Sequence, residues 1–369
     1  MLRRVGETID PKGAVVKIKD ASFPAPFASE LEYNSPVHGS WNIVHTGMQV
    51  PESIQIYVCA DNCMRGVVLT AAEMNAADRF SFVILEEQDL LNSNLEDITI
   101  EGVTDVLNKR GEHPKAVLLF TVCLHHFVGS NLDYIYSELG HRFPDICFIR
   151  CYMDPIMQKH GLTPDQKLRK AMYDPLPACE PDRKTVSIFG SDFALDESSD
   201  IRRLLKRYEY TVKELPACKT WQDLLDMSKG SLFIDCYPAG KYGMEAQAER
   251  LGRKHLYLPG SFDYDEIEKQ LKQLTDILGL PELTGEELAR ERESCEEVLA
   301  KAKTLIKDMP ITLDYLYHPR PLGLAKLLLT HGFCVKAVYL DGISPEEKEE
   351  FLWLQEHAPE LELIATIQV

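Results

Sequence analysis

The residues of this 369-residue chain whose types and spacing could do chemistry are three cysteines and two histidines in its first half. Cys59 and Cys63 are four residues apart, so one helical turn places them on the same face. Cys123, His125 and His126 form a second group. If both groups lie on one rim, three thiolates converge, and soft thiolates select zinc, copper(I) or iron-sulfur clusters. The spacing therefore predicts a metal or metal-cluster site.

The elements around these residues predict where they lie. Residues 115–122 have the continuous apolar pattern of a buried parallel strand, and a helix from about 128 to 141 follows. Cys123 then sits at the carboxyl end of the strand, where ligands bind in open α/β sheets. Cys151 ends the next predicted strand, 146–151, and is therefore a candidate fourth ligand.

Each candidate also has a plainer interpretation. A cysteine beside a strand or at a helix start is a common core residue, so the four cysteines could serve packing alone. His125 and His126 could ligate metal, donate protons or cap the following helix. The residues by themselves leave these alternatives open.

Strands and helices alternate along most of the chain, which predicts an α/β protein with parallel sheets and right-handed crossovers. We expect three Rossmann-like, doubly wound domains, the third shortened. The expected parts are an irregular N-terminal arm over residues 1–50, domain 1 with the candidate cysteines over 51–180, domain 2 over 181–284, and a charged helix plus partial domain 3 over 285–369. The arm is expected to pack on a partner or to cover a site.

Motifs that bind nucleotide phosphates are missing. The sequence has neither the phosphate loop Gly-x-x-x-x-Gly-Lys-Ser/Thr nor the dinucleotide fingerprint Gly-x-Gly-x-x-Gly, so we do not expect the chain to hydrolyse a nucleotide itself. The segment from His318 to Gly323 combines basic residues with a predicted helix start and could hold an anion. A turn chosen for its prolines is the alternative.

The composition excludes several kinds of partner. The chain carries 58 acidic and 40 basic residues, a formal net charge of -18, whereas nucleic acid and anionic membranes require a basic surface. No apolar run approaches the roughly 20 residues that span a bilayer, and the N-terminus lacks the apolar core of a signal peptide. We therefore expect a cytoplasmic protein without a nucleic-acid or membrane partner, whose ten cysteines are reduced.

Several segments resemble one known family. Pro36-Val37-His38-Gly39 is similar to its His-Gly-Pro segment, and the run from Phe82 to Leu90 resembles its Val-Phe-Gly-Gly-Glu-x-x-Leu. The run from Cys123 to Asn131 stands in the place of its Cys-x-x-x-Leu-Ile-Gly-Asp-Asp, and the run from Pro319 to Ala325 is also similar. On these segments and on element order, the chain resembles the nitrogenase component 1 family. That family includes the molybdenum-iron protein subunits, their cofactor-assembly scaffolds and the dark-operative protochlorophyllide reductase.

The resemblance implies three Rossmann-like domains around a cleft, with an iron-sulfur cluster, 4Fe-4S or larger, held by cysteines at a subunit interface. It also implies a homodimer or a heterodimer with a related subunit, and a separate ATP-hydrolysing iron-sulfur reductase that delivers electrons. Cys123 matches the family's third cluster cysteine and Cys63 its second. The first has no equivalent after His38-Gly39, so Cys59 is expected to substitute for it from another position.

Other family residues are changed. Ser130 and Asn131 replace the paired aspartates, and the cysteine and histidine that hold the nitrogenase active-site cofactor have no match, so nitrogen fixation itself does not carry over.

The leading hypothesis is a redox protein that binds a cluster through Cys59, Cys63 and Cys123, with Cys151, a partner chain or a non-cysteine group as fourth ligand. It would reduce a small-molecule substrate while one of the two histidines supplies protons. The alternatives are a scaffold on which a metal cluster is assembled and a metal-free, bilobal small-molecule binding module.

Overall fold

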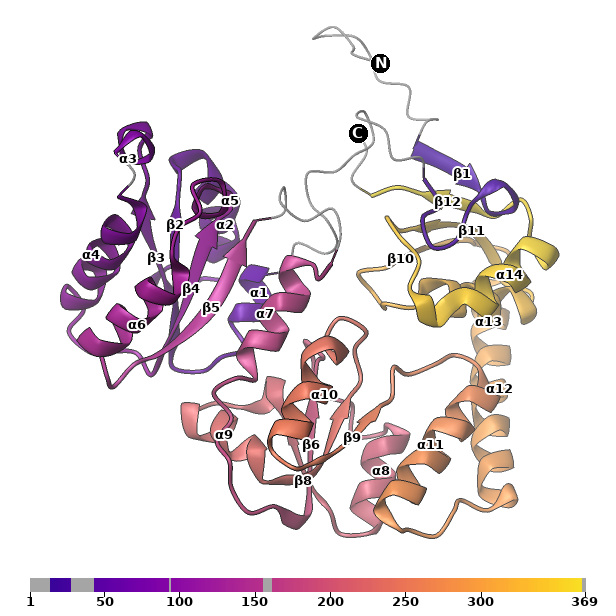
Figure 1. Cartoon of the computed structure of the whole chain (residues 1–369). Coiled ribbons are helices and arrows are strands. Elements are labelled where there is room, and N and C mark those ends of the chain that lie inside the picture. The colour runs from indigo at the N-terminus through magenta and orange to yellow at the C-terminus, as the bar shows by residue number, and fades with distance from the viewer. Residues whose placement is uncertain (1–13, 28–42, 93, 155–160, 367–369) are drawn as a thin grey trace, which may run out of the picture. The chain divides into compact units, whose positions relative to one another are not determined.

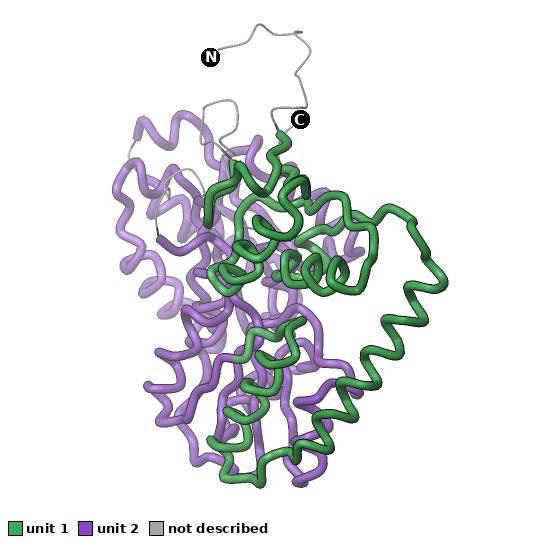
Figure 2. Tube along the Cα trace, turned by 90° about the vertical axis from the view of Figure 1, so that its right-hand side faces the viewer, with its two compact units in different colours: residues 1–35, 258–369 green, residues 36–257 purple. Residues whose placement is uncertain are grey.

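A computed structural model describes residues 14–27, 43–92, 94–154 and 161–366. The chain forms two compact units, which are coloured separately in Figure 2. Unit 1 combines residues 1–35 with residues 258–369, and unit 2 consists of residues 36–257.

The first half of unit 2 is a parallel sheet in the order β3-β2-β4-β5 (Figure 1). Its central strands, β2 (Ser53–Cys59) and β4 (Ala116–Val122), are buried along their whole length, as apolar strands covered on both faces are. Tyr57 of β2 stacks on Phe120 of β4, with ring centroids 4.3 Å apart. The other elements are α1 (Ile43–Gly47), α2 (Asp61–Glu73), β3 (Phe80–Ile84), α3 (Glu87–Leu91), α4 (Leu95–Asn108), α5 (Cys123–Phe127), α6 (Leu132–Arg142) and β5 (Cys147–Met153).

The second half of unit 2 repeats this architecture. Its sheet is parallel in the order β7-β6-β8-β9, and the chain enters it through α7 (Pro164–Met172), which Thr163 caps at its N-terminus. The remaining elements are β6 (Asp182–Phe189), α8 (Asp200–Arg207), β7 (Thr211–Glu214), α9 (Trp221–Asp226), β8 (Gly230–Asp235), α10 (Lys241–Arg250) and β9 (Lys254–Tyr257).

A buried arginine joins the two halves of unit 2. Arg169 of α7 donates to Asp165 at 3.0 Å, to Asp192 at 2.7 Å and to the carbonyl of Gly190 at 2.7 Å. Thr46 of α1 donates to the other oxygen of Asp165 at 2.9 Å. The buried guanidinium of Arg169 is therefore held by groups from both halves of unit 2, and these contacts fix the position of α7 between the two sheets.

Unit 1 contains a mixed sheet in the order β1-β12-β11-β10. Strands β10, β11 and β12 are parallel, whereas β1 runs antiparallel to β12, with Val15 opposite Ile364. The elements of unit 1 are β1 (Val15–Lys17), α11 (Tyr264–Leu278), α12 (Gly285–Ile306), β10 (Pro310–Asp314), α13 (Pro321–Thr330), β11 (Cys334–Tyr339), α14 (Lys348–His357) and β12 (Glu362–Ile364).

The α/β class and the three largely parallel sheets were predicted correctly, but the expected parts differ in two places. The segment 1–50 was expected to be irregular, yet it contributes β1 to unit 1 and α1 to unit 2; residues 28–42 of it lie outside the described ranges. Residues 264–278, which form α11, fall within the range expected for domain 2 but belong to unit 1, where Glu266 of α11 pairs with Arg320 and the N-cap Asp263 pairs with Lys326.

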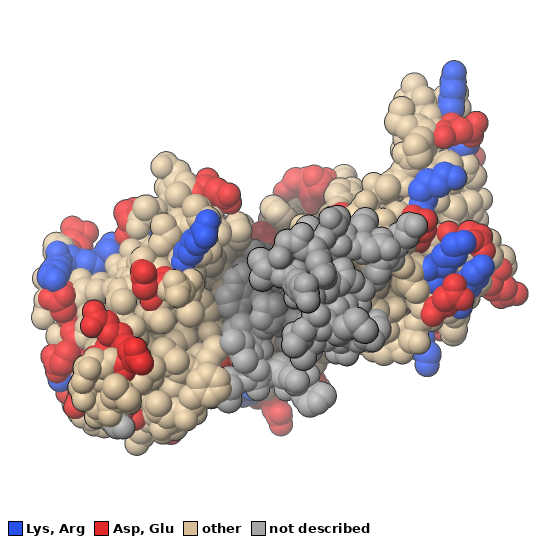
Figure 3. Space-filling model, turned by 90° about the horizontal axis from the view of Figure 1, so that it is seen from above, with Lys and Arg blue, Asp and Glu red and all other residues tan. Residues whose placement is uncertain are grey.

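The surface carries mixed charge. On the face drawn in Figure 3, lysines and arginines lie among acidic residues, and the coloured residues form no continuous basic patch there. Across the described ranges, no helix combines the length and the apolar content needed to cross a membrane.

Candidate functional site

The three candidate cysteines lie at the carboxyl edge of the first sheet of unit 2. Cys59 is the last residue of β2, Cys63 lies in the first turn of α2, and Cys123 is the first residue of α5, directly after β4. Strands β2 and β4 are neighbours in the sheet, so their ends lie side by side (Figure 1). The topology thus carries all three residues to one edge, which is where ligands bind in sheets of this kind.

Their exposure differs. Cys63 is exposed and Cys123 is half-buried, with its sulfur 4.0 Å from the carbonyl oxygen of Met153. Cys59 is fully buried in the hydrophobic core, and this burial raises the pKa of its thiol to about 12. Two of the three thiols are therefore accessible from outside the chain.

Cys151 does not reach the edge. Strand β5 continues to Met153, two residues beyond the end predicted from the sequence, and Cys151 pairs with Phe120 inside the sheet. Its thiol is fully buried, donates to the carbonyl of Ile149 at 3.5 Å, and has a pKa raised well above its ordinary value by burial. The packing interpretation fits this residue better than the role of fourth ligand.

The described residues contain no group of three or more His, Cys, Asp or Glu side chains arranged to hold a metal ion. The convergence of three thiolates expected from the sequence is thus not formed by these residues, because Cys59 lies in the core while Cys63 lies on the surface. A cluster at this edge could use Cys63 and Cys123 directly, but its remaining ligands would have to come from a partner chain or from a rearranged Cys59.

The helices that carry the two accessible thiols also expose apolar side chains. Leu69 on α2 is 56% exposed, and Phe127 and Val128 at the end of α5 are 63% and 44% exposed. Leu69 and Phe127 lie on the same two helices as Cys63 and Cys123, and Val128 directly follows α5. Phe127 lies four residues after Cys123, on the same face of α5, so a partner protein that covers this thiol would also cover the exposed ring.

The two histidines have different environments. His125 is buried: its Nδ1 accepts a hydrogen bond from the backbone N–H of Val122 at 3.2 Å, and its Nε2 lies 3.2 Å from the hydroxyl of Thr99. Burial lowers the pKa of His125 to about 4, so the ring is neutral near pH 7. Because both ring nitrogens are engaged inside the domain, this geometry fits a structural role and not the predicted proton donor.

His126 is the better placed of the pair. Its Nε2 lies 2.7 Å from a carboxylate oxygen of Asp154, which is fully buried, while the imidazole itself remains about one third exposed. A buried carboxylate fixes the orientation of the ring and leaves its outer surface accessible.

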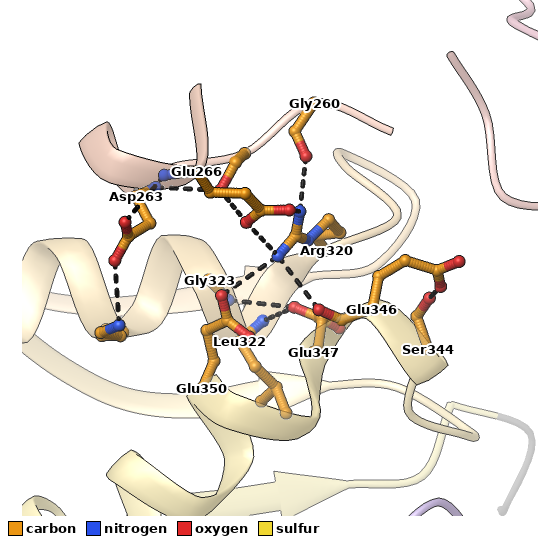
Figure 4. A network of polar contacts seen from close by, with 12 residues as sticks. Gly260, Asp263, Glu266, Arg320, Leu322, Gly323, Ser344, Glu346, Glu347 and Glu350 are labelled. Atoms are coloured by element: carbon orange, nitrogen blue, oxygen red, sulfur yellow. Dashed lines mark hydrogen bonds and ion pairs between the residues drawn. The ribbon is translucent and has the colours of Figure 1, made fainter. Parts of the chain in front are cut away.

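The helix start near His318, which was expected to hold an anion, is occupied by a carboxyl group of the protein itself. Glu347 accepts hydrogen bonds from the backbone N–H groups of Leu322 and Gly323, at 2.7 and 2.9 Å, at the N-terminus of α13 (Figure 4). Arg320 is also buried and pairs with Glu266 and Glu350 (Figure 4). Side chains of unit 1 itself therefore occupy this helix start, and burial raises the pKa of Glu347 to about 8.

One buried acidic residue, Asp235, was not predicted as a site residue from the sequence. Asp235 ends β8, next to β6, and is fully buried; its Oδ2 has no hydrogen-bond partner among the described residues. Burial raises the pKa of Asp235 to about 7. Gly190, at the end of β6, approaches it so closely that a Cβ there would lie 2.1 Å from Asp235 Oδ1. The only sequence signal was an acidic residue closing an apolar strand.

Comparison with known proteins identifies the family. The model of the nitrogenase component 1 type oxidoreductases matches residues 100–366, and the chain belongs to this family. The match includes Cys123 but not Cys59 or Cys63. No curated protein matches the chain.

Solved structures show the same fold. The structure described as "Nitrogenase Cp1 at pH 6.5" is 11% identical, with a TM-score of 0.66 over 100% of this chain and 80% of that chain. The structure described as "Nitrogenase Cp1 at pH 5" is 12% identical, with a TM-score of 0.59 over 97% of this chain and 81% of that chain. At these identities the likeness concerns the fold and not the site.

Proposed function

We propose that this chain is a redox subunit that shares an iron-sulfur cluster with a second subunit at the edge carrying Cys63 and Cys123. The observation that supports this function best is that the two accessible thiols follow adjacent strands, on helices that also expose Leu69 and Phe127. Family membership supports the same interpretation, since the chain belongs to the nitrogenase component 1 type oxidoreductases.

A second subunit is part of the proposal because the described residues of one chain do not assemble a metal site. A homodimer would bring a second Cys63 and a second Cys123 to the interface, and a heterodimer would bring the cysteines of a related chain. Covering Leu69 and Phe127 would also remove apolar area from water, at roughly 25 cal/mol per Å². The same contact would therefore complete the ligand set and shield the cluster.

A bound cluster would supply one-electron transfer, and an ATP-hydrolysing iron-sulfur reductase would be the electron source. The residues of this chain would hold it and tune it: Cys63 and Cys123 as thiolate ligands, and the backbone at the start of α5 as hydrogen-bond donor. His126, oriented by Asp154, is the proposed proton carrier for reduction of a small substrate.

Iron and acid-labile sulfide in anaerobically purified protein test the proposal. We expect iron bound to the wild type, and loss of most of it in Cys63→Ala and in Cys123→Ala. Cys295→Ala is the matched control, since Cys295 is also exposed but lies on α12 of unit 1, and it should keep the wild-type iron content. Cys151→Ala should keep it as well if its thiol only packs.

A second candidate, a metal-free binding module, is favoured by one specific observation, which is the burial of Cys59 and Cys151 in the core. Wild-type protein that stays free of iron after reconstitution with iron and sulfide would support this module and contradict the cluster. If iron is bound, reduction of a small substrate by an added reductase indicates an enzyme, whereas transfer of the cluster to an apoprotein indicates an assembly scaffold.

A further inference from the structure

Unit 1 contains a cavity among helices α11, α12, α13 and α14, with a volume of about 290 Å³. This volume is close to the lower limit for ligand pockets, which is about 300 Å³. The residues that line the cavity all belong to unit 1, so one compact unit forms the whole site.

One side of the cavity is apolar and held in place. It is formed by Phe262, which lies just before α11, and by Leu327 of α13. The ring of Phe262 packs edge-on against His318, with ring centroids 4.7 Å apart. It also lies close to Gly323, where an added Cβ would be 3.3 Å from Phe262 Cδ2. Because these contacts fix the ring within the chain, a ligand would not have to order it.

The donor groups on the opposite side already face carboxylates. The hydroxyl of Tyr264 donates to Glu296 at 2.8 Å, and Nε2 of His331 lies 2.9 Å from the other oxygen of Glu296. Lys326 donates to Asp263 at 3.2 Å. An anionic ligand would therefore have to displace one of these carboxylates.

Glu350 of α14 is the polar residue of the cavity that lacks a full set of partners. It is 5% exposed, and its Oε1 accepts a hydrogen bond from Arg320 at 3.1 Å (Figure 4). Its Oε2 is buried and has no hydrogen-bond partner within the described ranges. Arg320 pairs with Glu266 as well, so two carboxylates share one guanidinium. Because burial raises the pKa of the nearby Glu347 to about 8, that acid is mostly uncharged near pH 7, and one negative charge remains in excess.

We propose that the unit 1 cavity binds a small primary amine, whose ammonium group donates to Oε2 of Glu350 while its apolar body lies against Phe262 and Leu327. An ammonium group supplies the missing donor and also balances the excess charge, and charge-assisted hydrogen bonds are about twice as strong as neutral ones. The volume limits the ligand to a single ring or a short chain. The described residues that line the cavity include no cysteine, so this proposal does not rest on the cluster proposed for unit 2.

Saturation-transfer NMR with three matched probes tests the class of ligand. Benzylamine, benzyl alcohol and benzoate share one ring and differ in charge at pH 7. We expect benzylamine to bind wild-type protein with a dissociation constant in the millimolar range or below, and the other two probes to bind about tenfold more weakly or not at all. If benzylamine does not bind, water alone satisfies Oε2 of Glu350 and the proposal is wrong. Equal binding of benzyl alcohol, or stronger binding of benzoate, would contradict the preference for an amine.

A charge-removing variant tests the role of Glu350. Glu350→Gln removes the negative charge with little change in shape and should weaken benzylamine binding about tenfold. Glu349→Gln is the matched control, since it makes the same change one residue earlier in α14, where the side chain is exposed, and it should keep the wild-type affinity. An unchanged affinity in Glu350→Gln would overturn the assignment.

A cavity-filling variant tests the site without altering the contacts of Arg320. Thr330 lines the cavity, is exposed, and donates its hydroxyl to the carbonyl of Lys326 in its own helix. Thr330→Trp should fill the cavity and weaken benzylamine binding about tenfold. Thr304→Trp is the matched control, because Thr304 is also exposed and donates to the carbonyl of Ala300 but does not line the cavity. Circular dichroism should show wild-type folding for both. Equal affinities in the two tryptophan variants would mean that benzylamine binds elsewhere and would contradict the proposal.

Discussion

Replacing Asp235 by asparagine is expected to remove a pH dependence from the stability of unit 2. The carboxyl is fully buried with one unpartnered oxygen, and burial raises its pKa from 3.8 to about 7. Between these two pH values the folded state holds one more proton than the unfolded state, so stability is greatest at low pH and falls as the pH rises. From pH 5 to pH 7 this one group is expected to lower the free energy of unfolding by about 2 to 3 kcal/mol, at about 1.36 kcal/mol per pH unit.

The assay is urea unfolding of wild type and Asp235→Asn at pH 5, 6, 7 and 8. Other buried groups titrate as well, so the quantity of interest is the difference between the two free energies of unfolding at each pH. Relative to wild type, the variant should gain about 2 to 3 kcal/mol in free energy of unfolding between pH 5 and pH 8. Asp182→Asn is the control, because hydrogen bonds lower the pKa of Asp182 and it stays ionised throughout. Parallel curves for wild type and Asp235→Asn would refute the reasoning.

Three further substitutions test buried contacts by the same urea assay. Arg169→Ala should cost about 3 to 5 kcal/mol, because it leaves Asp165 buried without its cation; a loss below about 1 kcal/mol would contradict the role assigned to this arginine. Gly190→Ala should cost about 2 kcal/mol or more, since its φ is 86° and the new Cβ meets Asp235; wild-type stability would show that the two strand ends do not approach so closely. Glu347→Leu should lower the free energy of unfolding by about 2 to 4 kcal/mol, because it leaves the N–H groups of Leu322 and Gly323 without an acceptor. Glu347→Gln keeps an acceptor oxygen at this position and should lower it by about 1 kcal/mol only. Equal losses in the two variants would contradict these hydrogen bonds.

Local pattern was enough to predict much of the fold. The apolar run at 115–122 gave β4 to within one residue, and the capped, charged segment at 285–307 gave α12. Strand β2 was not predicted, although Ile54, Ile56 and Val58 have the required alternation. Strand β1 carries too weak a signal, because its three residues form a strand only by pairing with the distant β12.

For the candidate cysteines, the sequence predicted an edge of the sheet but not the burial of each side chain. The apolar run before Cys123 was enough to place this residue at the end of a strand, whereas the position of Cys59 at the end of the neighbouring β2 did not follow, because β2 was not predicted. The direction of each side chain does not follow from that pattern, so the burial of Cys59 and Cys151 was not foreseen. The buried charges of Arg169 and Arg320 were missed for a related reason, since their acidic partners lie on other elements and form no local motif.

The pairing of β1 with β12 constrains the order in which unit 1 can be completed during synthesis. Val15 to Lys17 are made before unit 2, but their hydrogen-bonding partners, Glu362 to Ile364, are made only after all of it. Unit 2 is contiguous and can therefore fold while the N-terminal strand still lacks its sheet. Until that closing pair forms, β1 and the unfinished edge of the unit 1 sheet are open strands, the kind of surface on which nascent chains misassociate and which chaperones bind.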